Sequence, residues 1–570
     1  MDRTKVSIRP SGLVWVAAAI CGACTGLVGE LPVQSTTSAP EPKVDGPIAP
    51  ELLVPPPKDA AEPQLRRLSA PQLAASVRDV LGIDDGDASE FLIPIDESTI
   101  PSLLTVERLR AAAAAVTSLR AHHRFVPCAV DGAGTEACAQ EFIETFAGRV
   151  FRRPLTAEEL DGLMTTYREA QTQFGFVDSL DLITEVIFQS PQFVYVFEEG
   201  RDEPGLPAGL RRLTSYELAT RLSYFLWDTT PDDALLAAAA SNRLDDDQQL
   251  GAEVERMLAD PRAKAKLIDF VTRLMELDGT ARHVSIEEAV KDPNLYPLDN
   301  PALRQAMRKE IGEFVGRVLD EGGSISELFL SRQAYVNGPL AQLYGLSDGP
   351  SRPDEWSWVT LPSEQRAGVA TRAAFLFVYA APDIPSPIRL GAAVWRDFFC
   401  YNFPPPPPEA ADVKIVPGEG QGQDPSIRRA VENKTSADLC RGCHSKMNPA
   451  GFAFGHYDAI GQWQDEERGT TPAGVAYQTA IDASSQLIGS DVEGAFDGAI
   501  ALSAKLAESR QVRNCFGAKL WSTAFGRAPA TGEEKSLAWI QARLAESGSL
   551  KEALVDLIQS PGFRYVRKAP

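Results

Sequence analysis

From about residue 65 onward, apolar residues recur every three or four positions along most of the chain. This spacing puts them on one face of an α-helix, as in amphipathic helices that pack on a core. The segments 68–82 and 214–228 also carry a Ser or Thr that can cap a helix start, and the first of them ends at a glycine. The alanine-rich segment 106–123 has a high helix propensity. Alternating strand patterns are scarce, so the sequence predicts a mostly α-helical protein made of several small helical modules.

Two pairs of segments in the chain resemble each other. Residues 66–82 resemble residues 211–227, and residues 138–196 resemble residues 515–566. Each copy of the longer pair runs from a cysteine-bearing helix, through a proline-bearing turn, to an apolar helix that ends at Ser-Pro. Because proline cannot continue a helix, the Ser-Pro step predicts the same helix end in both copies. The shared Q-S-P-x-F-x-Y-V string indicates an internal duplication.

The first 64 residues have the pattern of an export and anchoring segment. Basic residues precede the apolar run 13–20, which is too short to span a bilayer and is typical of a signal peptide over residues 1–23. The small residues before Cys24 resemble the processing site of a bacterial lipoprotein, with Cys24 as the lipidated residue. Cys21 stands where such sites usually have leucine, so cleavage without a lipid stays open. Residues 24–64 are rich in Pro, Ser, Thr and Ala, which predicts a lipid anchor followed by a disordered tether.

The charge balance narrows the class of partner. The 570 residues include 56 Lys and Arg against 78 Asp and Glu, for a formal net charge of −22. A nucleic-acid-binding protein needs a basic face to meet phosphates, so this balance argues against nucleic acid as a partner. It also argues against adhesion to an anionic membrane through a basic patch. The acidic surplus is expected to act mainly on solubility.

The eight cysteines indicate an oxidising compartment. Cys128 and Cys138 flank a short turn-forming segment, and we interpret them as a local disulfide. Once the C-x-x-C motif is set aside, Cys400 and Cys515 remain as a second, long-range pair. The alternative is that these two are free buried thiols.

One motif in the sequence predicts a site for a bound cofactor. Cys440, Cys443 and His444 form the string C-x-x-C-H, which in an exported chain is the attachment signature of c-type haem. Two thiols three residues apart on a helix can reach the two vinyl groups on one porphyrin edge, and His444 then falls under the iron as its ligand. A zinc site needs four ligands, and no second C-x-x-C or H-x-x-x-H lies nearby. The remaining alternative is a disulfide between Cys440 and Cys443.

The second axial ligand of such a haem is open. Met447, three residues after His444, would lie on the proximal side if the helix continues. His456 lies beyond a chain reversal that the segment 448–451 predicts, and it is sterically better placed for the opposite face. Three further candidates can reach the iron only through the tertiary fold: His122, His123 and Met275. If none of them binds, the iron keeps an open position.

The segment 440–463 resembles the signature of the planctomycete-type cytochrome c-like proteins, which are exported multi-domain proteins also abundant in myxobacteria. Their usual string is C-x-x-C-H, then Met-Asp-Pro, then Gly-Phe-Ala and Phe-Asp-x-x-Gly. The residues that match are Met447, Pro449, Gly451, Phe452, Ala453, Asp458 and Gly461. Asn448 replaces the usual aspartate, and His456 stands where the family usually has no histidine. The second departure counts against His456 as a ligand common to the family.

The resemblance extends over nearly all of the chain after the tether. It implies a series of helical modules at residues 65–125, 126–200, 208–346, 358–465 and 480–570. The C-x-x-C-H motif lies in the fourth of these, and the fifth resembles residues 138–196.

The function expected from these features is electron transfer by an exported c-type cytochrome-like protein. It would bind one covalent haem c and exchange electrons with an unidentified redox partner. Its lipid anchor would hold it in the periplasm or at the cell surface, most simply as an outer-membrane lipoprotein. Two alternatives of other classes are a haem enzyme of peroxidase or oxygenase type with an open sixth position, and a haem-free surface binding or scaffold lipoprotein. The sequence does not decide whether the protein is an enzyme.

Overall fold

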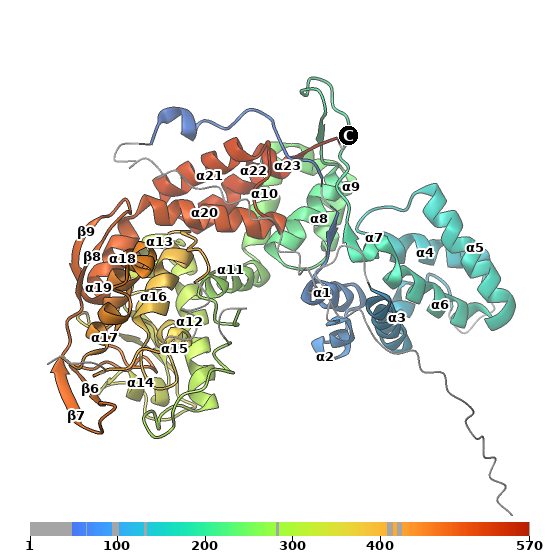
Figure 1. Cartoon of the computed structure of the whole chain (residues 1–570). Helices are drawn as coiled ribbons and strands as arrows, with labels where there is room; N and C mark the ends of the chain where they lie inside the picture. Colours follow the sequence, from blue (N-terminus) through green and yellow to red (C-terminus); the bar gives the residue numbers. More distant parts are fainter. Residues whose placement is uncertain are drawn as a thin grey trace, which may run out of the picture. The chain divides into compact units, whose positions relative to one another are not determined.

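The computed structural model describes residues 48–63, 65–93, 102–129, 134–280, 284–406, 414–418 and 424–568 (Figure 1). Most of this part of the chain is helical, and its strands form only two-stranded antiparallel sheets, which confirms the predicted mostly α-helical class. Within these ranges no helix is both long and apolar enough to cross a membrane. The predicted signal peptide, Cys24 and most of the predicted tether lie outside the described residues.

The first helical unit is closed by two short strands, β1 (Arg66–Arg67) and β2 (Tyr195–Val196), which pair with each other. Between the strands lie α1 (Ala70–Leu81), α2 (Asp85–Ala88), α3 (Leu103–Ser118), the 3₁₀ helix η3 (Ala121–Phe125), α4 (Glu136–Val150), α5 (Ala157–Phe174), α6 (Phe176–Gln189) and α7 (Pro191–Val194). Helices α4, α5 and α6 pack against one another, and α3 packs on α6 (Figure 1). At the start of α1, Ser69 and Gln72 form a reciprocal capping box, and the helix ends at Gly82 in the left-handed conformation that favours glycine.

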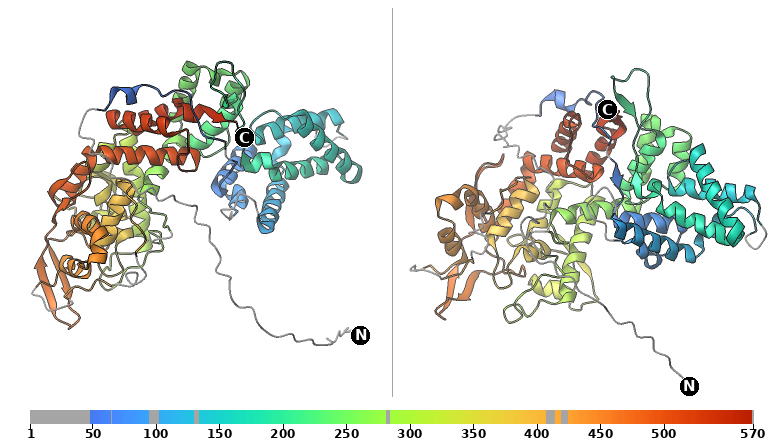
Figure 2. Two further views of the ribbon diagram at one scale, coloured as in Figure 1. Left: turned by 45° about the horizontal axis from the view of Figure 1, so that its top comes forward. Right: turned by 45° about the vertical axis from the view of Figure 1, so that its right-hand side comes forward.

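A second unit repeats the order of β1, α1, α4 to α7 and β2, whereas α2, α3 and η3 belong only to the first unit. It is closed by β3 (Leu210–Arg212) and β10 (Tyr565–Arg567), which also pair antiparallel. Its helices are α8 (Ser215–Leu226), α20 (Arg510–Phe525), α21 (Glu534–Ser547), α22 (Leu550–Gln559) and α23 (Pro561–Arg564). The red helices α20, α21 and α22 lie side by side in Figures 1 and 2. The two pairs of similar segments therefore belong to two copies of one unit, and residues 228–509 are inserted into the second copy.

Equivalent contacts recur at the turn before α5 and before α21. Arg153 pairs with Glu159 at 2.7 Å in the first unit, and Arg527 pairs with Glu533 at 2.6 Å in the second. Each arginine also donates to the backbone carbonyl of the next residue. Side-chain pairs of this kind fix the path of the chain between two helices, so the same turn chemistry gives the same helical hairpin.

One position of this turn has the same backbone conformation in both units but a different residue. Arg152 has a φ of 64°, and the corresponding Gly526 has a φ of 66°. Such a left-handed conformation is costly for a residue with a side chain. Arg152 compensates because its buried guanidinium donates to backbone carbonyls, that of Tyr195 at 2.8 Å among them. In the second unit Arg221, from α8, donates instead to the carbonyl of Phe563 at 2.6 Å.

The inserted part holds the helices and hairpins that carry the C-x-x-C-H motif. Its elements are α9 (Asp233–Ala240), α10 (Asp247–Leu258), α11 (Pro261–Leu274), α12 (Pro301–Asp320), α13 (Ile325–Leu330), β4 (Gln333–Val336), α14 (Gly338–Leu343), β5 (Ser357–Thr360), α15 (Ala373–Tyr379), α16 (Pro387–Ala393), the π-helix η6 (Val394–Phe398), α17 (Ile427–Lys434), α18 (Asp438–Phe452), β6 (Glu466–Thr470), β7 (Ala476–Ala480), β8 (Ser484–Leu487), β9 (Gly494–Asp497) and α19 (Gly498–Glu508). Strand β4 pairs with β5, β6 with β7, and β8 with β9.

Buried apolar side chains form two large clusters. The first core contains side chains from residues 68–196 together with Tyr224 of α8. The second core draws its side chains from residues between Leu213 and Val566 and includes side chains of the inserted part and of the second unit. The helix that bears the C-x-x-C-H motif is therefore anchored in a core built from several segments that lie far apart in the sequence.

Two glycines set the position of α18. It crosses α16 so closely that a Cβ added at Gly391 would overlap the carbonyl oxygen of Met447, and a Cβ added at Gly451 would overlap the carbonyl oxygen of Pro387. The indole Nε1 of Trp395 adds a hydrogen bond of 3.0 Å to the carbonyl of Lys446. Backbone against backbone is the tightest contact that two helices can make, and only glycine permits it here.

The chain reversal predicted at residues 448–451 is wrong. Helix α18 runs on through Pro449 and ends at Phe452. Proline removes one backbone hydrogen bond from a helix interior and is usually a breaker. Here the last turn is held by its packing on α16, so tertiary contact overrides the local signal.

Candidate functional site

Cys440, Cys443 and His444 lie in the first half of α18. Residues three and four positions apart share one face of a helix, so the helix by itself brings the two thiols and the imidazole together. Both sulfurs are free and half-buried. The alternative disulfide between them is therefore not formed in the structure.

A chain of hydrogen bonds fixes the orientation of the His444 ring. The Thr435 hydroxyl donates to the Val431 carbonyl at 2.8 Å, so its oxygen is left to accept a hydrogen bond from the Asn448 amide at 2.8 Å. That places the Asn448 carbonyl oxygen 2.9 Å from Nδ1 of His444. An amide oxygen only accepts, so Nδ1 is the donor of this hydrogen bond, and in the neutral ring Nε2 keeps its lone pair.

This is the tautomer that a metal-binding histidine requires when Nε2 is the ligand atom. The sequence reasoning found His444 but missed Asn448 and Thr435 as its supports. The signal for Asn448 was local, because it lies four residues after His444 on the same helix. Thr435 belongs to the turn that follows α17, and its proximity follows only from the fold.

The surface around the two thiols is open. A Cβ added at Gly442, between the cysteines, would have no atom within 4 Å, and the neighbouring Leu439 is 77% exposed. A cavity of about 270 Å³ lies at the other end of α18, where Phe452 and Gly455 line it. A cavity of about 980 Å³ is lined by residues of α1, α8, α11 and α20 and by none of α18. Two thiols and an imidazole on one face of a helix are a donor set that would fit covalent attachment of a haem.

The candidates for a second axial ligand have different surroundings. Met447 is buried where α18 meets α16, and Met275 is fully buried in the second core. His456 stacks on Trp463 with ring centroids 4.6 Å apart, and its Nδ1 lies 3.0 Å from the carbonyl of Gln464. Since a carbonyl only accepts, Nδ1 of His456 carries the proton and its Nε2 is also free to bind a metal.

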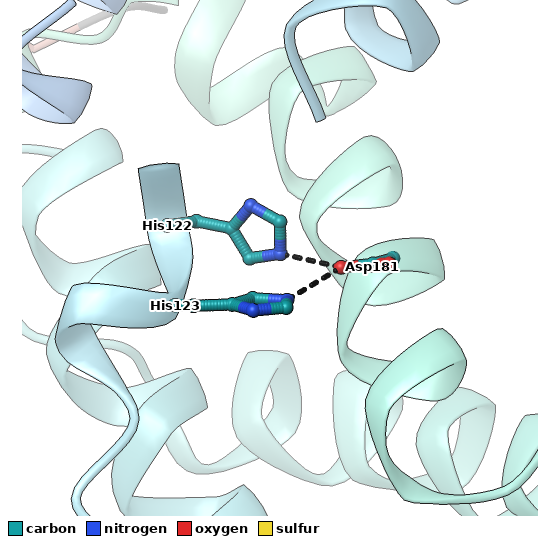
Figure 3. A group of neighbouring side chains, drawn as sticks. All are labelled: His122, His123 and Asp181. Carbon is teal, nitrogen blue, oxygen red and sulfur yellow. Dashed lines mark hydrogen bonds and ion pairs between the residues drawn. The ribbon is translucent and has the colours of Figure 1, made fainter. Parts of the chain in front are cut away.

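His122 and His123 lie on η3, beside the first core and far from α18 in the sequence. Both imidazoles contact the carboxylate of Asp181 (Figure 3). The sequence offered the two histidines only as distant haem ligands and did not indicate Asp181 as their partner. Two adjacent histidines were the available signal, whereas nothing local pointed to Asp181.

Both predicted disulfides are present in the structure. Cys128 bonds to Cys138, and Cys400 bonds to Cys515 across 115 residues of sequence. The first bridge closes the loop before α4, and the second ties the end of η6 to α20. Among the cysteines of the described chain, only Cys440 and Cys443 are left as thiols.

Comparison with known proteins identifies three families of domains along the chain. Residues 138–198 match PSD5, a protein of unknown function (DUF1595), and residues 213–346 match PSD4, a protein of unknown function (DUF1592). Residues 366–467 match PSCyt3, also a protein of unknown function (DUF1588). The comparisons with curated proteins and with solved structures found no match.

The third match contains α16, α18 and the whole C-x-x-C-H motif, and its family name marks it as cytochrome c-like. The first match covers α4 to β2, and the second covers the chain from α8 to α14. The chain is thus a planctomycete-type multi-domain protein that combines DUF1595 and DUF1592 domains with a cytochrome c-like DUF1588 domain.

Proposed function

We propose that the chain is an exported c-type cytochrome-like protein that binds one haem through Cys440, Cys443 and His444 and transfers electrons. The observation that carries the proposal is the hydrogen-bonded chain from Thr435 through Asn448, which engages Nδ1 of His444 and leaves Nε2 available as a ligand atom on the same helix face as two free thiols. A bound haem c would supply a one-electron iron couple.

The residues of α18 have separate tasks in this proposal. The sulfurs of Cys440 and Cys443 hold the haem edge through thioether bonds. His444 offers Nε2 to the iron, and Asn448 keeps the proton on Nδ1 and prevents the ring from rotating. A partner of this kind also raises the basicity of the ligand nitrogen and so tunes the iron. Because the surface beside the half-buried thiols is open at Leu439 and Gly442, an external redox partner could approach the haem edge directly.

Export is part of the same proposal. The two disulfides support it, since such bonds persist in secreted and periplasmic proteins and are rare in the cytosol. We infer a signal peptide over residues 1–23 and lipidation at Cys24, which would hold the protein in the periplasm or at the cell surface as an outer-membrane lipoprotein. The acidic composition argues against nucleic acid as a partner.

The test is a pyridine haemochrome spectrum of protein exported from a host with c-type maturation. We expect a c-type spectrum and haem that stays with the polypeptide after denaturation, both lost in the Cys440→Ala/Cys443→Ala variant. His456→Gln is the matched control, because it removes a histidine of the same domain and should leave the covalent haem intact. Wild-type protein that carries no haem and has both thiols free would refute the proposal and leave the binding or scaffold role.

A second measurement separates electron transfer from the enzyme alternative. If a side chain fills the sixth position, the haem should be low-spin and should bind cyanide slowly or not at all. A high-spin haem that binds cyanide rapidly would favour the peroxidase or oxygenase class. His456→Gln then becomes informative, because a change to high spin in that variant would identify His456 as the sixth ligand.

A further inference from the structure

A group of two histidines and one aspartate at the edge of the first core is not used by the haem proposal. Nε2 of His122 and Nε2 of His123 each lie 2.8 Å from Oδ1 of Asp181, and Figure 3 shows both rings directed at that carboxylate. One potential ligand atom from each residue falls within 4.8 Å of the others. Three nitrogen and oxygen donors that converge in this way are characteristic of a transition-metal site.

The backbone brings consecutive side chains to the same point. Both histidines lie on η3, and Asp181 lies on α6. The residue before η3, Arg120, has a φ of 56°, a left-handed conformation that is uncommon outside glycine. It turns the chain sharply after α3, so that the short helix presents both rings to α6.

The two carboxylate oxygens of Asp181 have separate environments. Oδ1 faces the two imidazoles, whereas Oδ2 lies 3.2 Å from a guanidinium nitrogen of Arg120. Carboxylates that bind metals are often hydrogen-bonded on the oxygen that does not bind, which holds the other in place. Arg120 occupies that supporting position.

The surroundings also suit a metal. His122 is fully buried, and the rings of Phe142 and Phe146 lie with their centroids 6.2 and 6.3 Å from its own. Burial, followed by repulsion from His123, lowers the pKa of His122 to about 4, so its ring is neutral at neutral pH, as metal binding requires. His123 and Asp181 are 17% and 19% exposed, which gives solvent access to one side of the group.

We propose that His122, His123 and Asp181 bind a divalent transition metal of the zinc class, with water as the fourth ligand. The ligand atoms would be the two Nε2 nitrogens and Oδ1. Two ligands of a tetrahedral zinc lie about 3.3 Å apart, given bond lengths of about 2.0–2.1 Å. Each of the two Nε2–Oδ1 distances, now 2.8 Å, needs to open by about half an ångström, and the two Nε2 atoms already lie within 4.8 Å of each other. Each ring would move its proton from Nε2 to Nδ1, so no net proton is released.

The test must first remove the competing thiols, because free Cys440 and Cys443 beside His444 can themselves bind zinc. We therefore use full-length protein with Cys440→Ser/Cys443→Ser as the reference. Zinc affinity is measured by competition with a chromophoric chelator, and cobalt is added separately to record its ligand-field bands.

Asp181→Asn removes the carboxylate charge, and Asp178→Asn is the matched control. Asp178 lies one turn earlier on α6 and contacts the same Arg120 at 3.4 Å, but it is 64% exposed and is not part of the group. We expect one zinc per reference chain and an affinity more than about 100-fold weaker in Asp181→Asn, since loss of an outer partner alone costs about 10–100-fold. Asp178→Asn should stay within about threefold of the reference.

His123→Gln provides a second variant, because His123 is partly exposed and its loss leaves the core intact, whereas a change at His122 would disturb it. Zinc should raise the thermal midpoint of the reference and leave that of His123→Gln unchanged. Equal zinc affinity in the reference and in Asp181→Asn would overturn the proposal. So would a cobalt spectrum of the reference that matches cobalt in buffer, a result that does not depend on how any variant folds.

Discussion

Replacing Gly451 by alanine probes the crossing of α16 and α18, on which the position of the C-x-x-C-H motif depends. A Cβ at this position would overlap the carbonyl oxygen of Pro387 and lie 3.0 Å from its Cα. These are backbone atoms, so no side chain can rotate to make room. To restore ordinary contact distances the helices must separate by more than about 1 Å. Over-packing of a core costs about 1–3 kcal/mol, and we expect about 3 kcal/mol here because neither partner can yield.

Gly442→Ala is the matched control on the same helix. A Cβ at Gly442 has no atom within 4 Å, so the substitution adds no contact. Alanine is favoured over glycine in a helix interior by about 0.8–1.0 kcal/mol. We therefore expect Gly442→Ala to stabilise the haem-free protein, which separates the two variants by about 4 kcal/mol in the free energy of unfolding.

Tryptophan fluorescence during urea unfolding is a suitable assay. The tryptophans of the described chain lie between Trp227 and Trp539, and none belongs to the first core. The signal therefore reports the second core, which contains α16 and α18. A Gly451→Ala protein that unfolds within about 1 kcal/mol of wild type would refute the reasoning, because it would mean that the helices can separate at little cost.

Three further perturbations have expected outcomes. Glu310→Gln breaks a fully buried ion pair with Arg372 at 2.6 Å and should cost about 3–5 kcal/mol in the same fluorescence assay. Cys400→Ala/Cys515→Ala opens a loop of 115 residues and should cost about 5 kcal/mol at 25 °C, measured in the same way. Burial lowers the pKa of His122 to about 4 in the folded chain, whereas in the unfolded chain it has the ordinary value of about 6.5. Between these two pH values the unfolded chain binds a proton at His122 that the folded chain does not bind. Stability of the first core should fall across that window by about 3 kcal/mol, measured by hydrogen exchange of α6.

Each of these has a control. Glu364→Gln changes an exposed carboxylate with no ion pair and should be neutral, so equal effects of the two Glu→Gln changes would contradict the role of the buried pair. Reduction of wild-type protein should reproduce the loss in the double cysteine variant. His122→Phe changes a buried residue and so also shifts the stability itself, but it should flatten the pH dependence of α6 exchange between about pH 6.5 and 4. An unchanged slope would show that other groups cause the pH dependence.

Much of the helical pattern could be predicted because helix ends are set locally. The expected helices at residues 68–82 and 214–228 are α1 and α8 in the structure, and each starts at a side chain that caps its own first turn. The third expected helix, at 106–123, ends early. Helix α3 stops at Ser118, and Arg120 turns the chain into η3. Nothing in an alanine-rich run signals that turn.

The hairpins β6–β7 and β8–β9 were not predicted. Their strands are four or five residues long and carry few apolar side chains, so alternation is too brief to stand out. The continuation of α18 through Pro449 was missed for a related reason. A proline beyond the first turn of a helix signals a break, and only the packing on α16 shows that the helix continues.

The sequence by itself determined the chemistry of α18. The spacing of Cys440, Cys443 and His444 places two thiols and an imidazole on one helix face in any fold, because helix geometry depends only on neighbours in the chain. Only the tertiary structure decided which nitrogen of His444 carries its proton, since that follows from Thr435 at the end of another helix. It likewise decided that β1 pairs with β2 and β3 with β10, and that His122, His123 and Asp181 meet. Those contacts join residues distant in the chain, and no local pattern of apolar and polar positions encodes them.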